Sequence, residues 1–224
     1  MRIEMIINIF IQARMSSSRF PGKVLAPLKG VPLIKWLIDS ALSIKQKNQV
    51  VVLTSTEHSD DPLVAYLKEI GCAYFRGHLE NVFNRFQKAL VQFPCDYFVR
   101  LSADSPYLQP DLIESLIESV QQVCPDFASN VYSRKFPKGQ SVEMAKTVVL
   151  QSIVDAWLTD EDREHIMPYF YRSTDKYKGL YFDTLVDRST ENMCVDTVAD
   201  LKRLEQFVNA YSLDKQALSI ATTS

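Results

Sequence analysis

The stretch from Met5 to Leu25 reads Met-Ile-Ile-Asn-Ile-Phe-Ile-Gln-Ala-Arg-Met-Ser-Ser-Ser-Arg-Phe-Pro-Gly-Lys-Val-Leu. β-Branched residues dominate positions 5–11, which predicts a buried strand. Three cations, Arg14, Arg19 and Lys23, follow within ten residues and are separated mostly by small side chains. Small residues let backbone N–H groups approach an anion, and the cations supply charge, so this loop suits a triphosphate.

Working outward from this stretch, short β-rich runs alternate with amphipathic stretches. The predicted strands are 49–54, 73–76 and 96–101, and the predicted helices are 32–45, 61–70, 79–92 and 110–121. This alternation predicts an α/β fold with a parallel sheet covered on both faces. The cation-rich loop then lies at the sheet edge where α/β proteins bind ligands.

The regular alternation of predicted strands and helices ends after residue 125. We expect a strand at 126–131, a loop with an antiparallel excursion at 132–150, a mostly helical stretch at 152–172, a strand at 177–183 and a helix at 197–211. The polar tail from Ala217 is expected to fray. Because no linker is recognisable, we expect one domain over residues 1–224, with an insertion around 132–175.

Composition narrows the class of protein. The 224 residues are 46% hydrophobic, which supports a sizeable core and disfavours global disorder. The formal charge of −2 disfavours a general nucleic-acid-binding protein. We find no secretory signal and no apolar run of about 20 residues that would span a membrane. The four cysteines form no CxxC pair, so we expect reduced thiols in a cytoplasmic protein.

Common phosphate-binding motifs do not match the loop. A P-loop would need glycine at Ser17 and serine or threonine at Val24, and no glycine precedes Gly22 to make a dinucleotide fingerprint. A solvated surface loop remains the other interpretation, but its position and cation density favour binding.

Two aspartates are candidate metal ligands. Asp104 follows the strand at 96–101 and could hold magnesium against phosphate oxygens, or it could simply start a turn before Pro106. Asp196 could reach the same metal, or it could be the N-cap of the helix from Thr197. A further cluster, Asp162-Arg163-Glu164-His165, suggests a polar pocket, although a lone histidine on a helix is more often structural.

Taken in order, these segments resemble the cytidylyltransferase family that activates acidic sugars, including acylneuraminate and 3-deoxy-manno-octulosonate. The resemblance is strongest to the branch of spore-coat polysaccharide biosynthesis protein F, whose pattern IQARMGSTRLPGKVL aligns with residues 11–25. Further matches are Phe75-Arg76-Gly77, Arg100 with Ala103-Asp104-Ser105-Pro106, Asp162–His165 with Pro168-Tyr169, and Val195-Asp196-Thr197.

The resemblance implies a Rossmann-like nucleotidyltransferase three-layer sandwich, with a mostly parallel sheet and a small antiparallel insertion. It implies Mg²⁺-dependent transfer of CMP from CTP to an acidic sugar, with release of pyrophosphate, for polysaccharide biosynthesis. It also implies a homodimer joined through the insertion.

The implied site residues fall into three groups. The resemblance makes Arg19, Lys23, Asp104 and Asp196 catalytic, with the two aspartates as metal ligands. It assigns nucleotide binding to Ala13, Arg14, Ser16, Ser17, Arg19, Lys23, Arg76 and Arg100. It assigns substrate binding to Arg85, Glu143 and His165.

Three positions depart from the branch pattern: Ser16 replaces a usual glycine, Asn84 a frequent aspartate, and Ser141 an aspartate. They keep open an inactive nucleotide-binding homologue. Another sugar nucleotidyltransferase or a nucleotide-sugar glycosyltransferase also remains an alternative. A glycosyltransferase would usually need a DxD-like metal motif, for which Asp60-Asp61 and Asp160-Glu161-Asp162 are the only close acidic groups.

Overall fold

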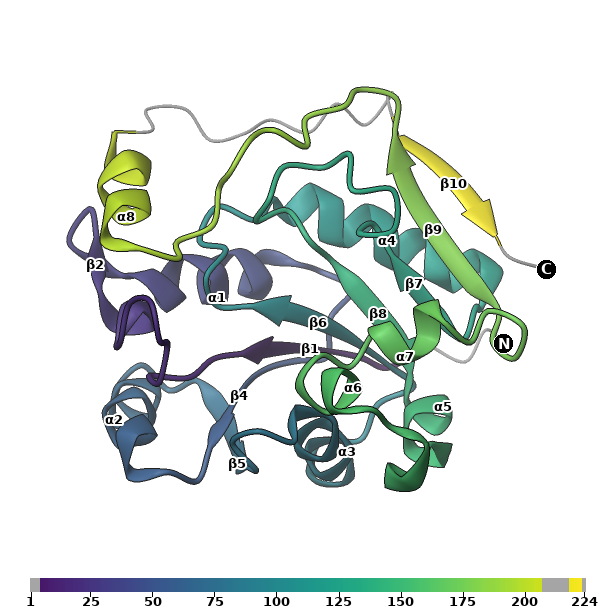
Figure 1. The fold of residues 1–224 in the computed structure, drawn as a ribbon, viewed down its shortest axis with the longest axis horizontal. Coiled ribbons are helices and arrows are strands. Elements are labelled where there is room, and N and C mark those ends of the chain that lie inside the picture. The colour runs from purple at the N-terminus through teal and green to yellow at the C-terminus, as the bar shows by residue number, and fades with distance from the viewer. Residues whose placement is uncertain (1–4, 207–217, 223–224) are drawn as a thin grey trace.

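The chain folds around an eight-stranded sheet, seen in a computed structural model that describes residues 5–206 and 218–222 (Figure 1). The strand order is β10-β9-β7-β8-β6-β1-β4-β5. The strands are β1 (Ile7–Gln12), β4 (Gln49–Ser55), β5 (Ala73–Gly77), β6 (Tyr97–Ser102), β7 (Phe127–Ser129), β8 (Glu143–Lys146), β9 (Gly179–Thr184) and β10 (Leu218–Thr222). A separate hairpin pairs β2 (Pro27–Leu28) with β3 (Val31–Pro32).

The sheet is mostly parallel. Strand β1 pairs in parallel with β4 and β6, β4 with β5, and β7 with β9. Strand β8 runs antiparallel to β6 and β7, and β10 runs antiparallel to β9. The predicted fold class, with its small antiparallel insertion, is confirmed.

Helices cover both faces of the sheet. They are α1 (Leu33–Ser43), α2 (Asp61–Glu69), α3 (Val82–Gln92), α4 (Pro110–Val123), α5 (Thr147–Ser152), α6 (Asp160–Glu164), α7 (Pro168–Tyr171) and α8 (Val198–Glu205), with short 3-10 turns η1 (Lys23–Leu25), η2 (His58–Asp60) and η3 (Asp155–Trp157). One apolar layer joins the sheet to α1, α2 and α4, and a second joins it to α3, α5 and α7.

Strand β1 shows why the sequence produces two layers. Side chains alternate across a strand, so Ile7, Ile9 and Ile11 pack in the first layer while Phe10 packs in the second. Phe10 stacks on Phe98 with ring centroids 5.8 Å apart. Because both faces are buried, four of the six residues of the strand are apolar.

The second half of the chain differs from the sequence prediction in detail. The stretch expected to be mostly helical at 152–172 is split, because Thr159 caps α6 with Asp162, and Pro168 starts α7. Helix α5 begins inside the loop predicted at 132–150 and ends at Ser152, whereas β8 confirms the antiparallel excursion.

At the C-terminal end, the prediction of a frayed tail is wrong for residues 218–222, which pair with β9. Residues 207–211 of the helix predicted at 197–211 lie outside the described residues, as does Ala217. No helix in the described ranges is long and apolar enough to cross a membrane.

Candidate active site

The cation-rich loop leaves β1 and folds back on itself at the sheet edge. The N–H groups of Ser17 and Gly22 both donate to the carbonyl of Met15, at 2.9 and 2.8 Å. Gly22 has φ +75°, a left-handed conformation that favours glycine, and it is the N-cap of the short turn η1. This closed loop brings Lys23, the next residue, back toward the sheet with only 9% of its surface exposed.

Asp60 links the loop after β1 to the end of β4. Its carboxylate is fully buried and accepts hydrogen bonds from the Ser55 hydroxyl at 2.5 Å, the Met15 N–H at 2.7 Å, and the Thr54 hydroxyl and Ser55 N–H at 2.9 Å each. Burial acts to raise the pKa of Asp60, but these hydrogen bonds together outweigh it and lower the pKa. The loop is therefore tied to the end of β4 by a carboxylate that stays ionised.

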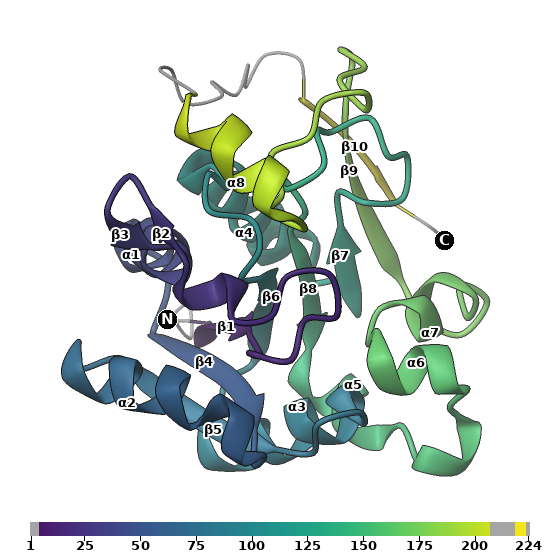
Figure 2. The ribbon, with the colours of Figure 1, turned by 60° about the vertical axis from the view of Figure 1, so that its left-hand side comes forward.

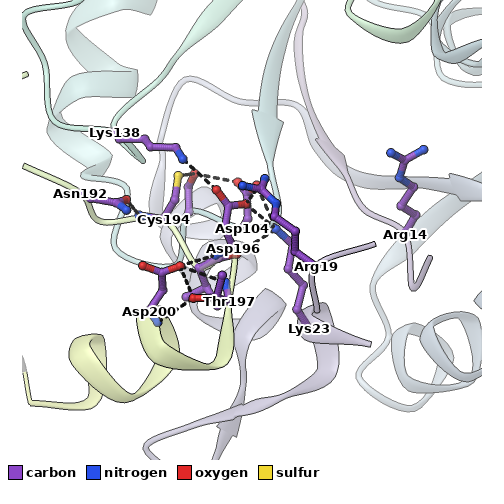
Figure 3. A network of polar contacts seen from close by, with 12 residues as sticks. Arg14, Arg19, Lys23, Asp104, Lys138, Asn192, Cys194, Asp196, Thr197 and Asp200 are labelled. Carbon is purple, nitrogen blue, oxygen red and sulfur yellow. Dashed lines mark hydrogen bonds and ion pairs between the residues drawn. The ribbon is translucent and has the colours of Figure 1, made fainter. Parts of the chain in front are cut away.

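Lys23 joins the two predicted aspartates (Figure 3). Its ammonium lies 3.3 Å from Asp104 Oδ2 and 3.2 Å from Asp196 Oδ1, and it donates to the Val195 carbonyl at 2.8 Å. The Val195 N–H donates to the Asp104 carbonyl at 2.9 Å, which ties the segment before α8 to the end of β6. Two carboxylates far apart in the sequence thus converge on one cation.

Asp196 is free to do this because it is not the cap of α8. Thr197 is the N-cap: its hydroxyl accepts from the Asp200 N–H, and the Asp200 carboxylate accepts from the Thr197 N–H at 2.9 Å. The N-cap interpretation of Asp196 is therefore wrong. The capping box leaves the Asp196 carboxylate to pair with Lys23 in the loop after β1. Helix α8 packs near this loop through the apolar cluster that contains Leu201 and has Phe20 against it (Figure 2).

Three cations surround Asp196. Besides Lys23, Arg19 Nη2 lies 3.1 Å from Oδ1, and Lys138 Nζ lies 2.7 Å from Oδ2. Burial acts to raise the pKa of Asp196, yet the hydrogen bonds from Lys138 and Lys23 lower it overall. Arg19 and Lys138 keep 64% and 55% of their side chains exposed, so both can move toward an incoming ligand.

A cavity of about 430 Å³ opens beside this cluster. Its walls include the loop residues Ala13, Arg14, Ser17, Ser18 and Arg19, together with Lys23, Arg100, Asp104, Glu164, His165 and Asp196. A second cavity of about 540 Å³ shares Arg14 and Glu164 with it and is otherwise lined by His78, Glu80, Asn81, Asp160 and Arg163. Figure 3 shows Arg14 set apart from the carboxylate cluster, and its guanidinium lies 3.7 Å from Glu164. The pair therefore lies where the two cavities meet.

Two side chains hold Arg100 at the cavity wall. It pairs with Glu143, its cross-strand partner in β8, and donates to Gln12 Oε1 at 3.1 Å. The Tyr171 hydroxyl donates to the other Glu143 oxygen at 2.5 Å and contacts the Ser129 hydroxyl at 2.7 Å. Burial, and then the charge of Glu143, raise the pKa of Tyr171 well above its usual value, so the hydroxyl remains a donor.

Glu143 is thus a brace for Arg100, with both oxygens engaged inside the protein, whereas the resemblance implied that it faces the sugar. Arg76 and Arg85, also predicted at the site, both make contacts within the protein. Arg76 donates to the Ser55 carbonyl at 2.8 Å and pairs with Asp61 at 2.8 Å.

Arg85 is fully buried and donates to the carbonyls of His78 at 2.9 Å and Leu79 at 2.7 Å, while burial lowers its pKa to about 10. It supports the segment beside the second cavity, and its burial keeps it from direct contact with a substrate.

Sequence reasoning missed three residues that shape this site: Asp60, Lys138 and Tyr171. Asp60 was noted only as part of a possible metal motif, and Tyr171 has no local signal. Lys138 does have a local signal, because it precedes Gly139, and a glycine often marks a backbone conformation that other residues rarely adopt. Ser16, expected at the nucleotide, belongs to the folded-back loop but is not among the residues that line the cavity of about 430 Å³.

The sequence model described as cytidylyltransferase matches residues 8–219. This chain belongs to the cytidylyltransferase family. The predicted family is therefore confirmed, and with it the prediction of an enzyme. The chain is 32% identical to spore coat polysaccharide biosynthesis protein SpsF of Bacillus subtilis, over 79% of this chain and 75% of that protein. It is 31% identical to 3-deoxy-manno-octulosonate cytidylyltransferase of Bdellovibrio bacteriovorus, over 91% of this chain and 98% of that protein.

Solved structures agree with this assignment. A cytidylyltransferase from Leptospira borgpetersenii superposes with a TM-score of 0.85 at 28% identity, covering 95% of this chain and 90% of that one. CMP:2-keto-3-deoxy-manno-octonic acid synthetase, solved with CTP, superposes with a TM-score of 0.68 at 18% identity, covering 89% of this chain and 97% of that one. At that identity the second likeness shows the fold alone.

Proposed function

We propose that this cytidylyltransferase transfers CMP from CTP to an acidic sugar of the ulosonic or nonulosonic type and releases pyrophosphate. The CMP-activated sugar would serve surface polysaccharide or glycan biosynthesis. The observation that carries the proposal is the Lys23 ammonium held between Asp104 and Asp196 beside a cavity of about 430 Å³. In the reaction, the sugar hydroxyl oxygen bonds to the α-phosphorus of CTP. The bond from that phosphorus to the pyrophosphate oxygen breaks, and the hydroxyl proton is released.

The donor set fits Mg²⁺. Asp104 and Asp196 converge on a cation already, in the form of the Lys23 ammonium. Within the described residues, no three histidine, cysteine, aspartate or glutamate side chains gather to hold a metal. Magnesium usually takes one or two carboxylates and completes its octahedron with water and phosphate oxygens, which matches this sparse site. When bound there, magnesium would neutralise charge on the triphosphate.

The chain's own residues would align two anionic reactants. Arg19 and Lys23 would offset the charge of the phosphates, and the loop from Arg14 to Lys23 would bind along the triphosphate. Arg100, held by Gln12 and Glu143, is suited to bind the sugar carboxylate. His165 lines the same cavity and would contact the sugar. The two adjoining cavities give room for two reactants, with Arg14 between them.

The glycosyltransferase alternative has less support. Asp60 is buried and saturated with hydrogen bonds, and Asp61 pairs with Arg76. Asp162, in the other acidic group, caps α6 and pairs with Arg172. Neither group offers two free carboxylates to a metal.

The proposal includes the wider organisation expected from the resemblance. Residues 1–224 form one nucleotidyltransferase domain, and the enzyme works in the cytoplasm as a homodimer joined through residues 132–175. Segment 132–175 also supplies His165 to the cavity, together with Glu143 and Tyr171, which hold Arg100. Sedimentation of the purified chain tests the dimer.

Thermal unfolding with ATP, CTP, GTP and UTP, each with and without Mg²⁺, tests the nucleotide. Ligand at 100 times its Kd stabilises by about 2.7 kcal/mol, or roughly 5–11 °C for a chain of this size. A magnesium-dependent shift for CTP alone supports the proposal and leads to pyrophosphate assays with a panel of sugar acids. A shift for another nucleotide would overturn the assignment of cytosine as the base. No shift with any nucleotide would favour an inactive homologue.

The role of Asp104 as a metal ligand is tested with Asp104→Asn, and Asp39→Asn is the matched control. Asp39 serves as the control because it pairs with Lys35 on the exposed side of α1. Pyrophosphate release should fall at least about a hundredfold for Asp104→Asn and stay unchanged for Asp39→Asn. Equal rates for the two variants would remove Asp104 from the mechanism.

A further inference from the structure

Lys138 is the third cation on Asp196, and it comes from a part of the chain that carries no recognised motif. Its ammonium lies 2.7 Å from Asp196 Oδ2, while Arg19 and Lys23 contact Oδ1 at 3.1 and 3.2 Å. With Asp104, the cluster holds two carboxylates and three cations. The site therefore has a net positive charge before any nucleotide arrives.

The backbone of Lys138 is held firmly, whereas its side chain is not. Its N–H donates to the Glu191 carbonyl at 2.9 Å, and its carbonyl accepts from the Met193 N–H at 2.7 Å. Gly139 lies so close to this segment that a Cβ there would be 2.8 Å from the Met193 carbonyl carbon. The Lys138 side chain keeps 55% of its surface exposed, against 11% for Lys23. A cation on a fixed base can thus exchange one partner for another.

We propose that Lys138 binds the pyrophosphate part of the nucleotide, moving its ammonium from Asp196 to the β- and γ-phosphate oxygens. This inference rests on the proposed function. A divalent cation held by Asp104 and Asp196 would compete with Arg19, Lys23 and Lys138 for the same oxygens, so these side chains would lose carboxylate partners when the phosphates arrive. Charge-assisted contacts to phosphate replace the lost ion pairs. Lys138 then stays with pyrophosphate after CMP has moved to the sugar.

The proposal differs measurably from a purely structural role. If Lys138 only neutralised Asp196, its loss would change stability and affect every ligand alike. If it binds the β- and γ-phosphates, its loss weakens pyrophosphate but spares CMP, which carries only the α-phosphate. The test therefore compares two defined ligands on the same variants.

The variant is Lys138→Met, which removes the charge and keeps an unbranched side chain. Lys135→Met is the matched control, because Lys135 lies in the same loop but pairs with Asp183 at 2.8 Å. Calorimetry with inorganic pyrophosphate and with CMP, each with Mg²⁺, gives the Kd values. For Lys138→Met we expect the pyrophosphate Kd to rise about tenfold or more, with the CMP Kd unchanged. Lys135→Met should match the wild type, and Lys138→Arg should recover most of the affinity.

Each other outcome overturns the proposal. An unchanged pyrophosphate Kd in Lys138→Met removes the role, and if the wild type still turns CTP over, the proposed function stands without it. Equal weakening of CMP and pyrophosphate indicates a general disturbance of the site. A wild-type protein that binds neither CTP nor pyrophosphate overturns the proposed function as well.

Discussion

The Lys23 ammonium lies 3.2 Å from Asp196 Oδ1, although 173 positions separate the two residues in the chain. Lys23 arrives there because Gly22 closes the loop after β1 and Lys23 begins η1. Asp196 arrives because Thr197, one residue later, caps α8 and leaves the carboxylate free. The ion pair therefore depends on local conformation at both ends, and it joins the first strand of the sheet to the last described helix.

Lys23→Met should lower turnover by a factor of about 10²–10³, because the reaction loses a positioned cation that offsets charge on the phosphates. The fold should persist, since Arg19 and Lys138 still contact Asp196. Pyrophosphate release under saturating CTP measures the effect. Lys35→Met on α1 is the control, and turnover of Lys23→Met within twofold of it would contradict the role.

Asp60→Asn should destabilise the protein and loosen the loop after β1. The carboxylate accepts from Met15, Thr54 and Ser55, and replacing it weakens buried charge-assisted hydrogen bonds, for a loss of about 2–3 kcal/mol at pH 7. Urea unfolding of the variant and of Asp39→Asn measures this loss.

The same variant should show a distinct pH dependence. The folded pKa of Asp60 lies below the unfolded value of about 3.9, since hydrogen bonds to the carboxylate outweigh its burial. Asp60 therefore contributes stability above about pH 4, and that contribution is lost as the pH falls through the lowered pKa. The stability difference between wild type and Asp60→Asn should shrink in that range. A difference that stays constant down to pH 3 would show that ionisation of Asp60 is not involved.

Local pattern was enough to predict much of the fold and the centre of the site. The apolar run around Ile9 predicted β1, and the cations after it marked the loop that now holds Lys23. The strand before Asp104 is parallel to β1, so both end at the same sheet edge. Asp196 was a candidate from its position before the helix at 197–211, where an N-cap role was also open, and the resemblance favoured the metal-ligand role.

The remaining features depend on pairing that sequence reasoning cannot see. Lys138 reaches Asp196 because its backbone pairs with residues 191–193. The segment 218–222 forms a strand because β9 offers an edge to it. Glu143 was expected at the sugar, but its cross-strand neighbour is Arg100, and that pairing takes its charge. These features depend on contacts between segments that are distant in sequence, which local pattern does not reveal.

Tyr171→Phe should weaken binding of the acidic sugar more than binding of CTP. Loss of the hydroxyl removes a donor from the buried Glu143, which frees Arg100 to shift from the cavity wall. We expect the sugar KM to rise about tenfold, with a stability loss of about 1–2 kcal/mol. Tyr97→Phe is the matched control, because the Tyr97 hydroxyl donates at 2.6 Å to the Pro125 carbonyl in the core. A similar stability loss without a change in sugar KM is expected for the control, and equal KM values in both variants would contradict the brace.

Gly139→Ala should disturb the loop that carries Lys138, both by straining the backbone and by placing a Cβ against neighbouring backbone. Comparison with Gly30→Ala separates these two effects. Both glycines have positive φ, +94° and +78°, so either alanine strains the backbone by about 1–3 kcal/mol. Only at Gly139 would the new Cβ also meet backbone, 2.8 Å from Met193 and 2.9 Å from Cys194, whereas nothing lies within 4 Å at Gly30. Gly139→Ala should therefore lose more stability than Gly30→Ala in urea unfolding. It should also weaken pyrophosphate binding, because separation of residue 138 from residues 191–193 moves the Lys138 ammonium away from Asp196. Equal effects of the two alanines on pyrophosphate affinity would mean that the close approach at Gly139 does not position Lys138.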